Sequence, residues 1–257
     1  MLLQPTIEKL HGLRLKGMAE ALSRQLETSE TVGLSFEERL GLIVDYEWDL
    51  RQSKKTQRRL KEAKLKARAC VADIDYRHPR GLQREVIQEL ARCHWIHGRR
   101  NLVITGPTGV GKTWLACALS ARACREGLTV AYLRVPRLVD ELSMAKADGS
   151  YLKQLRRLAS RDLLLIDDFG LTPLTGEAGG YLLEILDDRV GQRSTLVTSQ
   201  LPVDKWHAVI DEPTVADAVL DRLLGGATRI VLKGASMRST TTRPTADGHL
   251  SETEKGE

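Results

Sequence analysis

No apolar run in the 257-residue sequence is longer than an ordinary β-strand, so no segment has the length of a membrane-spanning helix. The first residues, MLLQPTIEKLHGLRLKG, also lack the charged start, apolar middle and cleavage site of a secretory signal. These two absences predict a cytoplasmic protein with no membrane partner.

Cysteine is scarce, and its four copies form neither a C-x-x-C pair nor a zinc-ligand spacing. Cys93-His94 with His97 suggests a metal at first sight, but a zinc site needs about four ligands and the sequence nearby supplies no others. Cys117 and Cys124 lie seven residues apart in a predicted helix and therefore share one face, as core residues do. We predict buried thiols in a reducing compartment.

The clearest motif is a phosphate-binding loop. The segment NLVITGPTGVGKT contains the pattern G-x-x-x-x-G-K-[ST] between a predicted strand and a predicted helix. Glycines let backbone amides curl around phosphates, and the start of the helix directs its positive end at the anion. Lys112 supplies a charge for the β- and γ-phosphates, and Thr113 supplies a hydroxyl for magnesium. The predicted nucleotide-binding residues here are Gly106, Pro107, Thr108, Gly109, Val110, Gly111, Lys112, Thr113 and Trp114.

The stretch LLLIDDFG admits two interpretations. Asp168-Phe169-Gly170 resembles the metal-binding triplet of protein kinases, whereas the apolar run into Asp167 reads as the buried strand and metal carboxylate of a P-loop ATPase. The kinase interpretation fails, because the kinase glycine-rich loop and the H-R-D-x-x-x-x-N segment are missing from the sequence. Asp167 is therefore predicted to bind Mg²⁺ with Thr113. Asp168 stands where many such ATPases have a glutamate that orients water, and its shorter side chain predicts slow basal hydrolysis.

Polar residues after the next predicted strand are candidates for a contact to the γ-phosphate. Thr198, Ser199 and Gln200 end that strand, and the reach of its side chain favours Gln200, although polar residues that merely end a strand remain the alternative. Two arginines follow. Arg222, at the end of a predicted helix, is the candidate to complete a neighbouring subunit's site, with a surface ion pair as the alternative, and Arg229 is expected to be structural.

The order of elements predicts an α/β fold. From Asn101 onward, short apolar strands alternate with helices, which is typical of a parallel sheet, here of five strands at 102–105, 129–133, 163–167, 195–199 and 229–232. The N-terminal part reads as helical, with a capping-box pattern at Ser35 and Glu38. We expect a helical domain at 1–72, a linker and helix at 73–100, an ATP-binding domain at 101–238 and a disordered polar tail at 239–257.

Basic residues are concentrated in the predicted long helix. Between residues 51 and 68, Glu62 is the only acid. At about 100° per residue, Arg51, Lys54, Lys55 and Arg58 share one face. A solvated helix surface is the alternative, but charges of nearly one sign repel one another unless an anion is close. The pattern therefore favours contact with DNA through Arg51, Lys54, Lys55, Arg58 and Arg59.

Several segments in a fixed order resemble one family. DIDYR, NLVITGPTGVGKT, RVPRLVDEL, LLLIDDFGL, TSQLP and LDRLL…RIVLKGASMR together resemble the IstB-like helper ATPases of insertion-sequence transposons, which are related to the helicase loader DnaC and more distantly to the initiator DnaA. The resemblance spans residues 36–238. It implies an AAA+ ATPase domain behind a small helical domain, with ATP and Mg²⁺ as cofactors. It also implies ATP-dependent homo-oligomers that bind and deform duplex DNA and recruit and stimulate a cognate transposase.

The resemblance also assigns roles to residues. Arg222 matches the family's trans-acting arginine, and Ile74 and Tyr76 match a segment that lines the adenine pocket. The segment from Arg134 to Ser160 matches a helical insertion that makes such proteins assemble as open spirals. Its basic residues are expected to face DNA or to pair with neighbouring subunits: Arg134, Arg137, Lys153, Arg156 and Arg157. Arg238 matches a family arginine whose role the sequence leaves undefined.

Two other functions compete with this interpretation. A DnaC-like replicative helicase loader shares the ATPase domain but needs a surface for a helicase hexamer and for single-stranded DNA. A small-molecule P-loop kinase needs an acceptor pocket and a lid, and the basic segment would contribute little to it.

Overall fold

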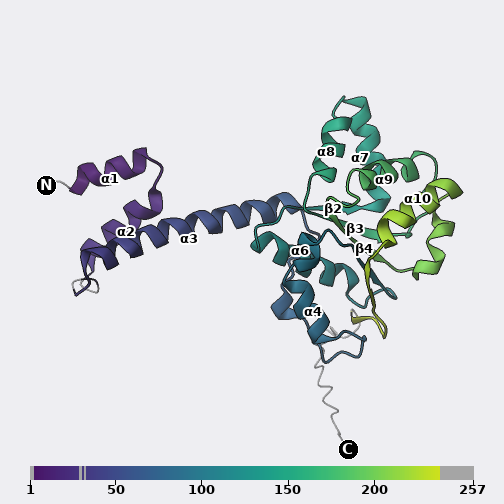
Figure 1. Cartoon of the computed structure of the whole chain (residues 1–257), viewed down its shortest axis with the longest axis horizontal. Coiled ribbons are helices and arrows are strands. Elements are labelled where there is room, and N and C mark those ends of the chain that lie inside the picture. Colours follow the sequence, from purple (N-terminus) through teal and green to yellow (C-terminus); the bar gives the residue numbers. More distant parts are fainter. Residues whose placement is uncertain (1–2, 29–30, 32, 238–257) are drawn as a thin grey trace, which may run out of the picture.

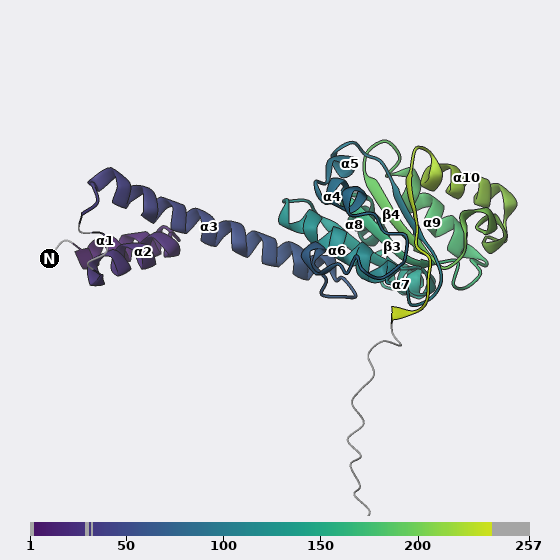
Figure 2. The same cartoon turned by 90° about the horizontal axis from the view of Figure 1, so that it is seen from below.

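The structure, a computed structural model, describes residues 3–28, 31 and 33–237. Arg238 and the tail 239–257 lie outside the described residues. An N-terminal helical arm projects from an α/β core, and the long helix of the arm runs into that core (Figures 1 and 2). The arm consists of α1 (Leu3–Gly12), α2 (Lys16–Glu27) and α3 (Phe36–Ala63). Within the described residues, no helix is both long and apolar enough to cross a membrane.

Helix α3 is one continuous helix of 28 residues. Its start is the predicted capping box: the Glu38 amide donates to Ser35 Oγ at 3.2 Å, and the Ser35 amide donates to Glu38 Oε2 at 2.8 Å. Its end is marked by Lys64, which adopts a left-handed conformation with φ of 51°. Cys70 belongs to the part of the chain that the sequence predicts to be helical, but it lies in the irregular segment beyond α3.

The first half of α3 packs against α2 through an unusually close contact. A Cβ on Gly17 would lie 2.8 Å from Glu47 Cα, so only glycine permits this approach. The amides of Gly17 and Met18 donate to Glu47 Oε2 at 2.6 and 3.2 Å, so the carboxylate caps the first turn of α2. Glu47 also pairs with Arg51. A glycine that weakens the helix by propensity is thus the one that lets the two helices meet.

The sheet has five parallel strands, as the sequence predicts, and their order in space is β2-β3-β4-β1-β5. Strand β4 lies between β1 and β3, so the chain segments that follow these three strands meet at one edge of the sheet. The strands are β1 (Leu102–Thr105), β2 (Val130–Arg134), β3 (Leu163–Phe169), β4 (Ser194–Ser199) and β5 (Thr228–Val231).

Helices cover both faces of the sheet and bury a hydrophobic core on each. On one face pack α4 (Arg84–Ala91), α5 (His94–His97), α6 (Lys112–Arg125) and the last turn of α3. On the other pack α7 (Val135–Ala147), α8 (Tyr151–Ala159), α9 (Glu177–Asp187) and α10 (Pro213–Leu224). Short 3₁₀ turns occupy Val71–Asp73, Val203–Lys205 and His207–Val209.

The last turns of α3 belong to the core rather than to the arm. Ala63 is fully buried and Leu60 packs against the same hydrophobic cluster as α6. Arg59 is half-buried there, with its guanidinium beside Gly127. The long helix of the arm therefore ends inside the core, beside the site described below.

The predicted helix over residues 82–96 is broken in two. Cys93 has a left-handed backbone with φ of 62°, which separates α4 from α5. Trp95 Nε1 donates to the Leu90 carbonyl at 3.1 Å, which satisfies an end of α4. The thiols of Cys93 and Cys124 are buried and free, and burial raises the pKa of each to about 11. The prediction of buried thiols is confirmed for Cys93, Cys117 and Cys124, and the described residues contain no group of metal-ligating side chains.

Candidate nucleotide-binding site

The phosphate-binding loop is held in a conformation that requires glycine. Gly106, Gly109 and Gly111 have φ values of 146°, 86° and 88°. A Cβ on Gly106 would lie 2.2 Å from the carbonyl oxygen of Leu232, and one on Gly109 would lie 2.0 Å from Ser236 Oγ. The segment that follows β5 therefore lies directly against the loop.

The two polar residues that end the loop point toward the site. Lys112 is buried, and its Nζ donates to the Pro107 carbonyl at 2.7 Å. Thr113 Oγ1 donates to Asp167 Oδ1 at 2.8 Å. The loop after β1 and the acidic end of β3 are thus joined directly, although β4 lies between these two strands in the sheet.

Asp167 is fully buried and accepts hydrogen bonds from three hydroxyls. These are Thr113 on α6, Thr198 on β4 and Tyr132 on β2, the last at 2.7 Å. Burial and the bond to Asp167 together raise the pKa of Tyr132 far above its usual range, so the phenol stays a donor. The Asp167 carboxylate is thus held in place by neutral hydroxyl donors from three elements, α6, β2 and β4.

Asp168 faces the same site because the strand is irregular there. Successive residues of a regular strand point to opposite faces. The pairing of β3 with β4 shifts register between Ile166 and Phe169, and Asp168 has a left-handed φ of 59°. Its amide donates to Thr198 Oγ1 at 3.3 Å, and its carboxylate accepts from Arg134 Nε at 2.8 Å. A strained backbone of this kind is expected at a functional residue.

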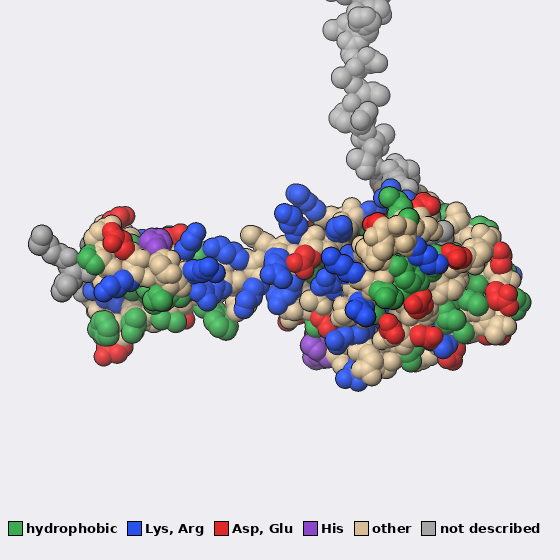
Figure 3. All heavy atoms as spheres, turned by 90° about the horizontal axis from the view of Figure 1, so that it is seen from above, with side chains coloured by type: hydrophobic (Ala, Val, Ile, Leu, Met, Phe, Trp, Pro, Cys, Tyr) green, Lys and Arg blue, Asp and Glu red, His purple; other side chains and the backbone are tan. Residues whose placement is uncertain are grey.

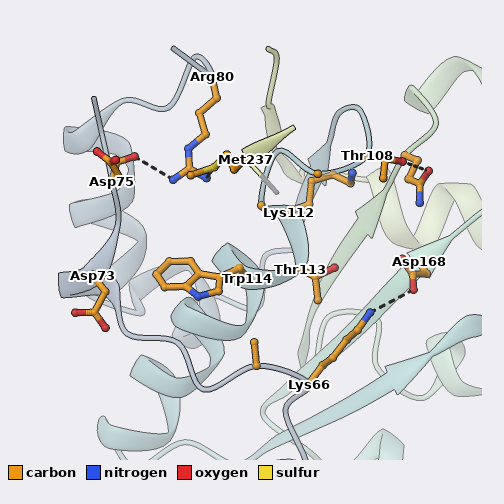
Figure 4. Close-up of a pocket in the computed structure, with 14 residues that line it drawn as sticks. Lys66, Asp73, Asp75, Arg80, Thr108, Lys112, Thr113, Trp114, Asp168 and Met237 are labelled. Carbon is orange, nitrogen blue, oxygen red and sulfur yellow. Dashed lines mark hydrogen bonds and ion pairs between the residues drawn. The ribbon is translucent and has the colours of Figure 1, made fainter. Parts of the chain in front are cut away.

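A cation that the sequence placed in the basic helix also enters the site. Lys66 follows the end of α3, and its Nζ lies 3.7 Å from Asp167 Oδ2 and 3.8 Å from Asp168 Oδ2. About half of its side chain, 47%, is exposed, while that of Asp167 is 0% exposed. Figure 4 shows Lys66 reaching toward Asp168 from the side opposite the loop.

A cavity of about 520 Å³ adjoins these groups, a size that fits a nucleotide. One end is lined by Thr108, Gly109, Gly111, Lys112 and Thr113 of the loop, with Asp168 and Gln200. The rest of the lining comes from Trp114, the connector and the segment after β5, with Lys66 beside Asp168: Lys66, Ala67, Asp73, Asp75, Arg80 and Met237. Loop residues Gly106, Pro107 and Val110 support the cavity without lining it.

The connector places different side chains in the cavity from those expected. Ile74 is buried in the hydrophobic core, and Tyr76 packs against that core beneath Arg84. Their alternate neighbours Asp73 and Asp75 line the cavity instead. Ile74 and Tyr76 are not among the residues that line the cavity, and the expectation that they contact adenine stays a prediction.

Arg80 anchors the connector beneath the loop. It is 2% exposed, and it donates from Nη1 to the Val110 carbonyl at 3.0 Å and from Nη2 to the Asp75 carbonyl at 3.2 Å. Its Nε has no hydrogen-bond partner among the described residues. Burial lowers the pKa of this guanidinium. Arg80 thus links the connector at Asp75 to the phosphate-binding loop at Val110.

The three polar residues after β4 have separate surroundings. Thr198 bonds the two aspartates, and Ser199 Oγ donates to the Phe169 carbonyl at 2.6 Å. Both are buried. Gln200 lines the cavity, and its Oε1 accepts from Thr108 Oγ1 at 2.6 Å. Of the three, Gln200 is placed for the predicted contact to a γ-phosphate.

Arg222 does not line the cavity of its own chain. On α10, its Nε pairs with Asp187 and its Nη1 donates to the Ala218 carbonyl at 2.8 Å. The surface ion pair that the sequence left open for Arg222 is thus present in this structure, and its partner is Asp187. Whether Arg222 also acts on a neighbouring subunit stays a prediction.

The predicted DNA-contacting residues of the arm lie on or beside its exposed middle. Lys54, Lys55 and Arg58 are exposed on α3, and Figure 3 shows Lys and Arg side chains covering this part of the helix. Arg58 Nε lies 2.9 Å from Glu62 Oε1. Arg51 is committed elsewhere, since it pairs with the buried Glu47 and donates to the Arg14 carbonyl.

The basic residues of the expected insertion divide into two groups. Arg137 on α7 and Lys153 and Arg156 on α8 are exposed, and Arg157 is half-buried with its Nε 2.9 Å from Gln154 Oε1. Arg134 is different, because its ion pair with Asp168 places it at the nucleotide site. Whether Arg134 or any other of these residues faces DNA or a neighbouring subunit stays a prediction.

Six residues that contact or line the site were not predicted as site residues: Lys66, Asp73, Asp75, Arg80, Tyr132 and Met237. Asp73, Asp75 and Met237 belong to segments that resemble the family, but the sequence assigned no role to them. For β2 a signal existed, because Tyr132 and Arg134 alternate on a strand that pairs with β3, with Arg134 opposite Asp167. Lys66 and Arg80 come from irregular segments whose side-chain directions no sequence period gives.

The oxygen ligands fit a magnesium ion. Mg²⁺ prefers oxygen donors and commonly takes one or two protein ligands, with phosphates and waters completing the octahedron. Thr113 and Asp167 supply a hydroxyl and a carboxylate that already contact each other at the loop.

Comparison with known proteins identifies relatives across nearly the whole chain. A family model described as IstB-like ATP binding protein matches residues 8–245. An insertion-sequence ATP-binding protein of Sinorhizobium fredii is 49% identical over 93% of this chain and 97% of its own length. The ATP-binding protein of insertion sequence IS1162 from Pseudomonas fluorescens is 51% identical over 79% of this chain and 88% of its own length.

Solved structures share the core fold. DnaI matches with a TM-score of 0.56 at 22% identity, over 64% of this chain and 91% of DnaI. The DnaC helicase loader matches with a TM-score of 0.51 at 20% identity, over 61% of this chain and 93% of DnaC. AMPPCP-bound DnaA from Aquifex aeolicus matches with a TM-score of 0.54 at 18% identity, over 66% of this chain and 51% of DnaA. These likenesses show a P-loop AAA+ core behind N-terminal helices.

Proposed function

The chain belongs to the IstB-like ATP-binding proteins of insertion sequences, and from that premise we propose that it is an ATP-switched, DNA-binding helper of transposition. It binds ATP with Mg²⁺, forms homo-oligomers on duplex DNA and deforms that DNA. It then recruits and stimulates the cognate transposase. The observation that carries the proposal is the continuity of α3: the helix with the exposed basic face leads, three residues after its end, into the nucleotide cavity at Lys66.

The side chains at the cavity support ATP hydrolysis. Lys112 stands at the phosphate end, and Thr113 with Asp167 would hold magnesium. When bound, magnesium neutralises charge on the β- and γ-phosphates. In this proposal Asp168 orients a water and accepts its proton, and Gln200 contacts the γ-phosphate; both side chains line the cavity.

Arg134 supports the expectation that basal hydrolysis is slow. Its ion pair at 2.8 Å occupies a carboxylate oxygen of Asp168, which must be free to act on water. We propose that assembly completes the site: Arg222 lies outside the cavity of its own chain, and it would leave its pair with Asp187 to reach the site of a neighbour. An arginine supplied in trans typically raises the rate of phosphoryl transfer by about 10³–10⁵.

Charge reversal on α3 tests the DNA-binding part of the proposal. Lys54→Glu, Lys55→Glu and Arg58→Glu together remove the exposed cations while leaving Arg51 in its pair with Glu47. We expect weaker binding to every duplex sequence. Each lost phosphate contact should also flatten the dependence of log affinity on log salt by about 0.9.

The matched control also reverses three exposed positive charges, but on the core instead of the arm: Arg100, Lys205 and Arg229. Affinities are measured by fluorescence anisotropy with labelled duplexes at several salt concentrations. If the α3 variant binds DNA like the parent, or if the control loses as much affinity, the basic face of α3 is not the DNA-binding surface.

The helicase-loader alternative is favoured by the fold alone, through the likeness of the core to DnaI and DnaC. A loader should prefer single-stranded DNA and require a helicase for stable binding. A transposition helper should prefer duplex DNA and respond to ATP without a helicase. Anisotropy with single-stranded and duplex probes of equal length separates the two functions.

A further inference from the structure

Lys66 places a cation beside Asp167 and Asp168, the two carboxylates at the proposed magnesium site. Its Nζ lies 3.7 Å from Asp167 Oδ2 and 3.8 Å from Asp168 Oδ2, so one ammonium bridges both carboxylates. Lys66 pairs with Asp167, and the three hydroxyls that donate to this carboxylate are neutral. Asp168 has a second cation, Arg134.

The geometry of the Lys66 contact is that of a replaceable ion. Both separations are longer than a direct hydrogen bond, and nearly half of the Lys66 side chain is exposed. An ammonium on a flexible stem is a mobile point charge, whereas Mg²⁺ binds oxygens at about 2.0–2.1 Å. A divalent ion held by Thr113 and Asp167 would meet Lys66 within a few ångströms, and like charges so close repel strongly.

We propose that Lys66 is an internal counter-cation that competes with the magnesium ion for the Asp167–Asp168 pair. When magnesium and nucleotide bind, Lys66 leaves the pair. When they dissociate, it returns and keeps the buried carboxylate of Asp167 neutralised.

This exchange links the nucleotide to the arm through a very short segment. Lys66 is three residues beyond Ala63, the fully buried last residue of α3, and one residue before Ala67, which lines the cavity. Leu65 packs against the hydrophobic core between them. Movement of Lys66 therefore acts on the junction that sets the direction of α3. This regulatory role rests on the proposed function, in which α3 binds DNA.

A magnesium titration without DNA tests the competition. A fluorescent ATP analogue at fixed concentration is bound to Lys66→Met, to the parent and to Lys61→Met, which removes one exposed charge from α3. We expect Lys66→Met to lower the magnesium concentration at half-saturation about three- to tenfold, as expected for loss of one partly exposed charge. Lys61→Met and Lys66→Arg should stay within about twofold of the parent. An unchanged or higher midpoint for Lys66→Met overturns the proposal.

Two further measurements keep the test decisive. Lys66→Gln is titrated in parallel, and each variant's melting temperature is recorded, so a folding defect in one substitution does not decide the result. Hydrogen–deuterium exchange of residues 61–69 is compared for the parent with the ATP analogue plus magnesium and with the analogue plus chelator.

We expect residues 61–69 of the parent to exchange faster with magnesium than with chelator, and we expect no such difference in Lys66→Met. Equal exchange in the parent under the two conditions overturns the link to the arm. Neither measurement contains DNA. A failure here therefore leaves the DNA-binding proposal intact, and a failure of the α3 charge reversal leaves the competition at Lys66 intact.

Discussion

Replacing Thr198 with valine should damage the protein in a way that replacing its neighbour Gln200 does not. Thr198 is 1% exposed, and its hydroxyl donates to Asp167 Oδ1 while it accepts the Asp168 amide at 3.3 Å. Valine has nearly the same shape but neither bond. Gln200 bonds Thr108 at the open side of the cavity, where water can replace the lost partner.

The expected loss of stability follows from the two broken bonds. A hydrogen bond to a charged group contributes about 1.5–3 kcal/mol, and a buried amide left without a partner costs about 1–3 kcal/mol. Because part of this is recovered by relaxation and by the methyl group, we expect Thr198→Val to lower the free energy of unfolding by about 2–4 kcal/mol. At about 2–4 °C per kcal/mol for a chain of this size, the melting temperature should fall by about 5–15 °C.

The assay pairs stability with hydrolysis. Thermal and urea unfolding are measured for the parent, Thr198→Val and Gln200→Ala, together with phosphate release under saturating ATP and magnesium. Gln200→Ala should change stability by less than about 0.5 kcal/mol, as is usual at accessible positions, but should slow hydrolysis. Thr198→Val should lower both the stability of the protein and its rate of hydrolysis. A Thr198→Val protein as stable as the parent would refute the bridging role, as would an equal loss of stability in Gln200→Ala.

Three other substitutions probe the site and its support. Asp168→Asn should retain nucleotide affinity in a binding titration but slow single-turnover hydrolysis by about 10²–10⁴, and hydrolysis within threefold of the parent would exclude Asp168 as the base. Arg222→Ala breaks a surface pair with Asp187, so it should cost under about 1 kcal/mol in urea unfolding while leaving the assembled protein inactive in phosphate release; normal release would remove Arg222 from the mechanism. Arg189→Met removes a buried guanidinium that donates to four backbone carbonyls, and should lower the free energy of unfolding by about 3–5 kcal/mol; a loss below 1 kcal/mol would show that those carbonyls find other donors.

The parts of the site that were predictable are those set by local sequence. The loop from Gly106 to Thr113 carries its own strand, glycines and helix start, and the structure places all three as expected. The apolar strand before Asp167 is likewise readable, because a buried parallel strand is a continuous apolar run. The five strands follow from the same signal, each within one or two residues of its predicted bounds.

The parts that escaped prediction depend on where irregular segments turn. Lys66 lies among cations that suit a helix surface, yet the helix ends at Lys64 in a left-handed conformation, and the chain beyond it turns into the cavity. In the connector, Ile74 and Tyr76 were assigned to the cavity by resemblance to the family, whereas the structure packs these apolar side chains against the core and leaves Asp73 and Asp75 at the cavity. Asp168 faces the site only through a register shift, which follows from the pairing of β3 with β4 rather than from either strand alone.

The most direct test of the central claim is sedimentation of the full chain with duplex DNA in the presence of ATP and magnesium, of ADP and magnesium, or of no nucleotide. If bound ATP joins subunits into an array on the duplex, a large protein–DNA species should form with ATP and should be reduced or missing in the other two conditions. A single subunit that sediments free of DNA in all three conditions would contradict the account.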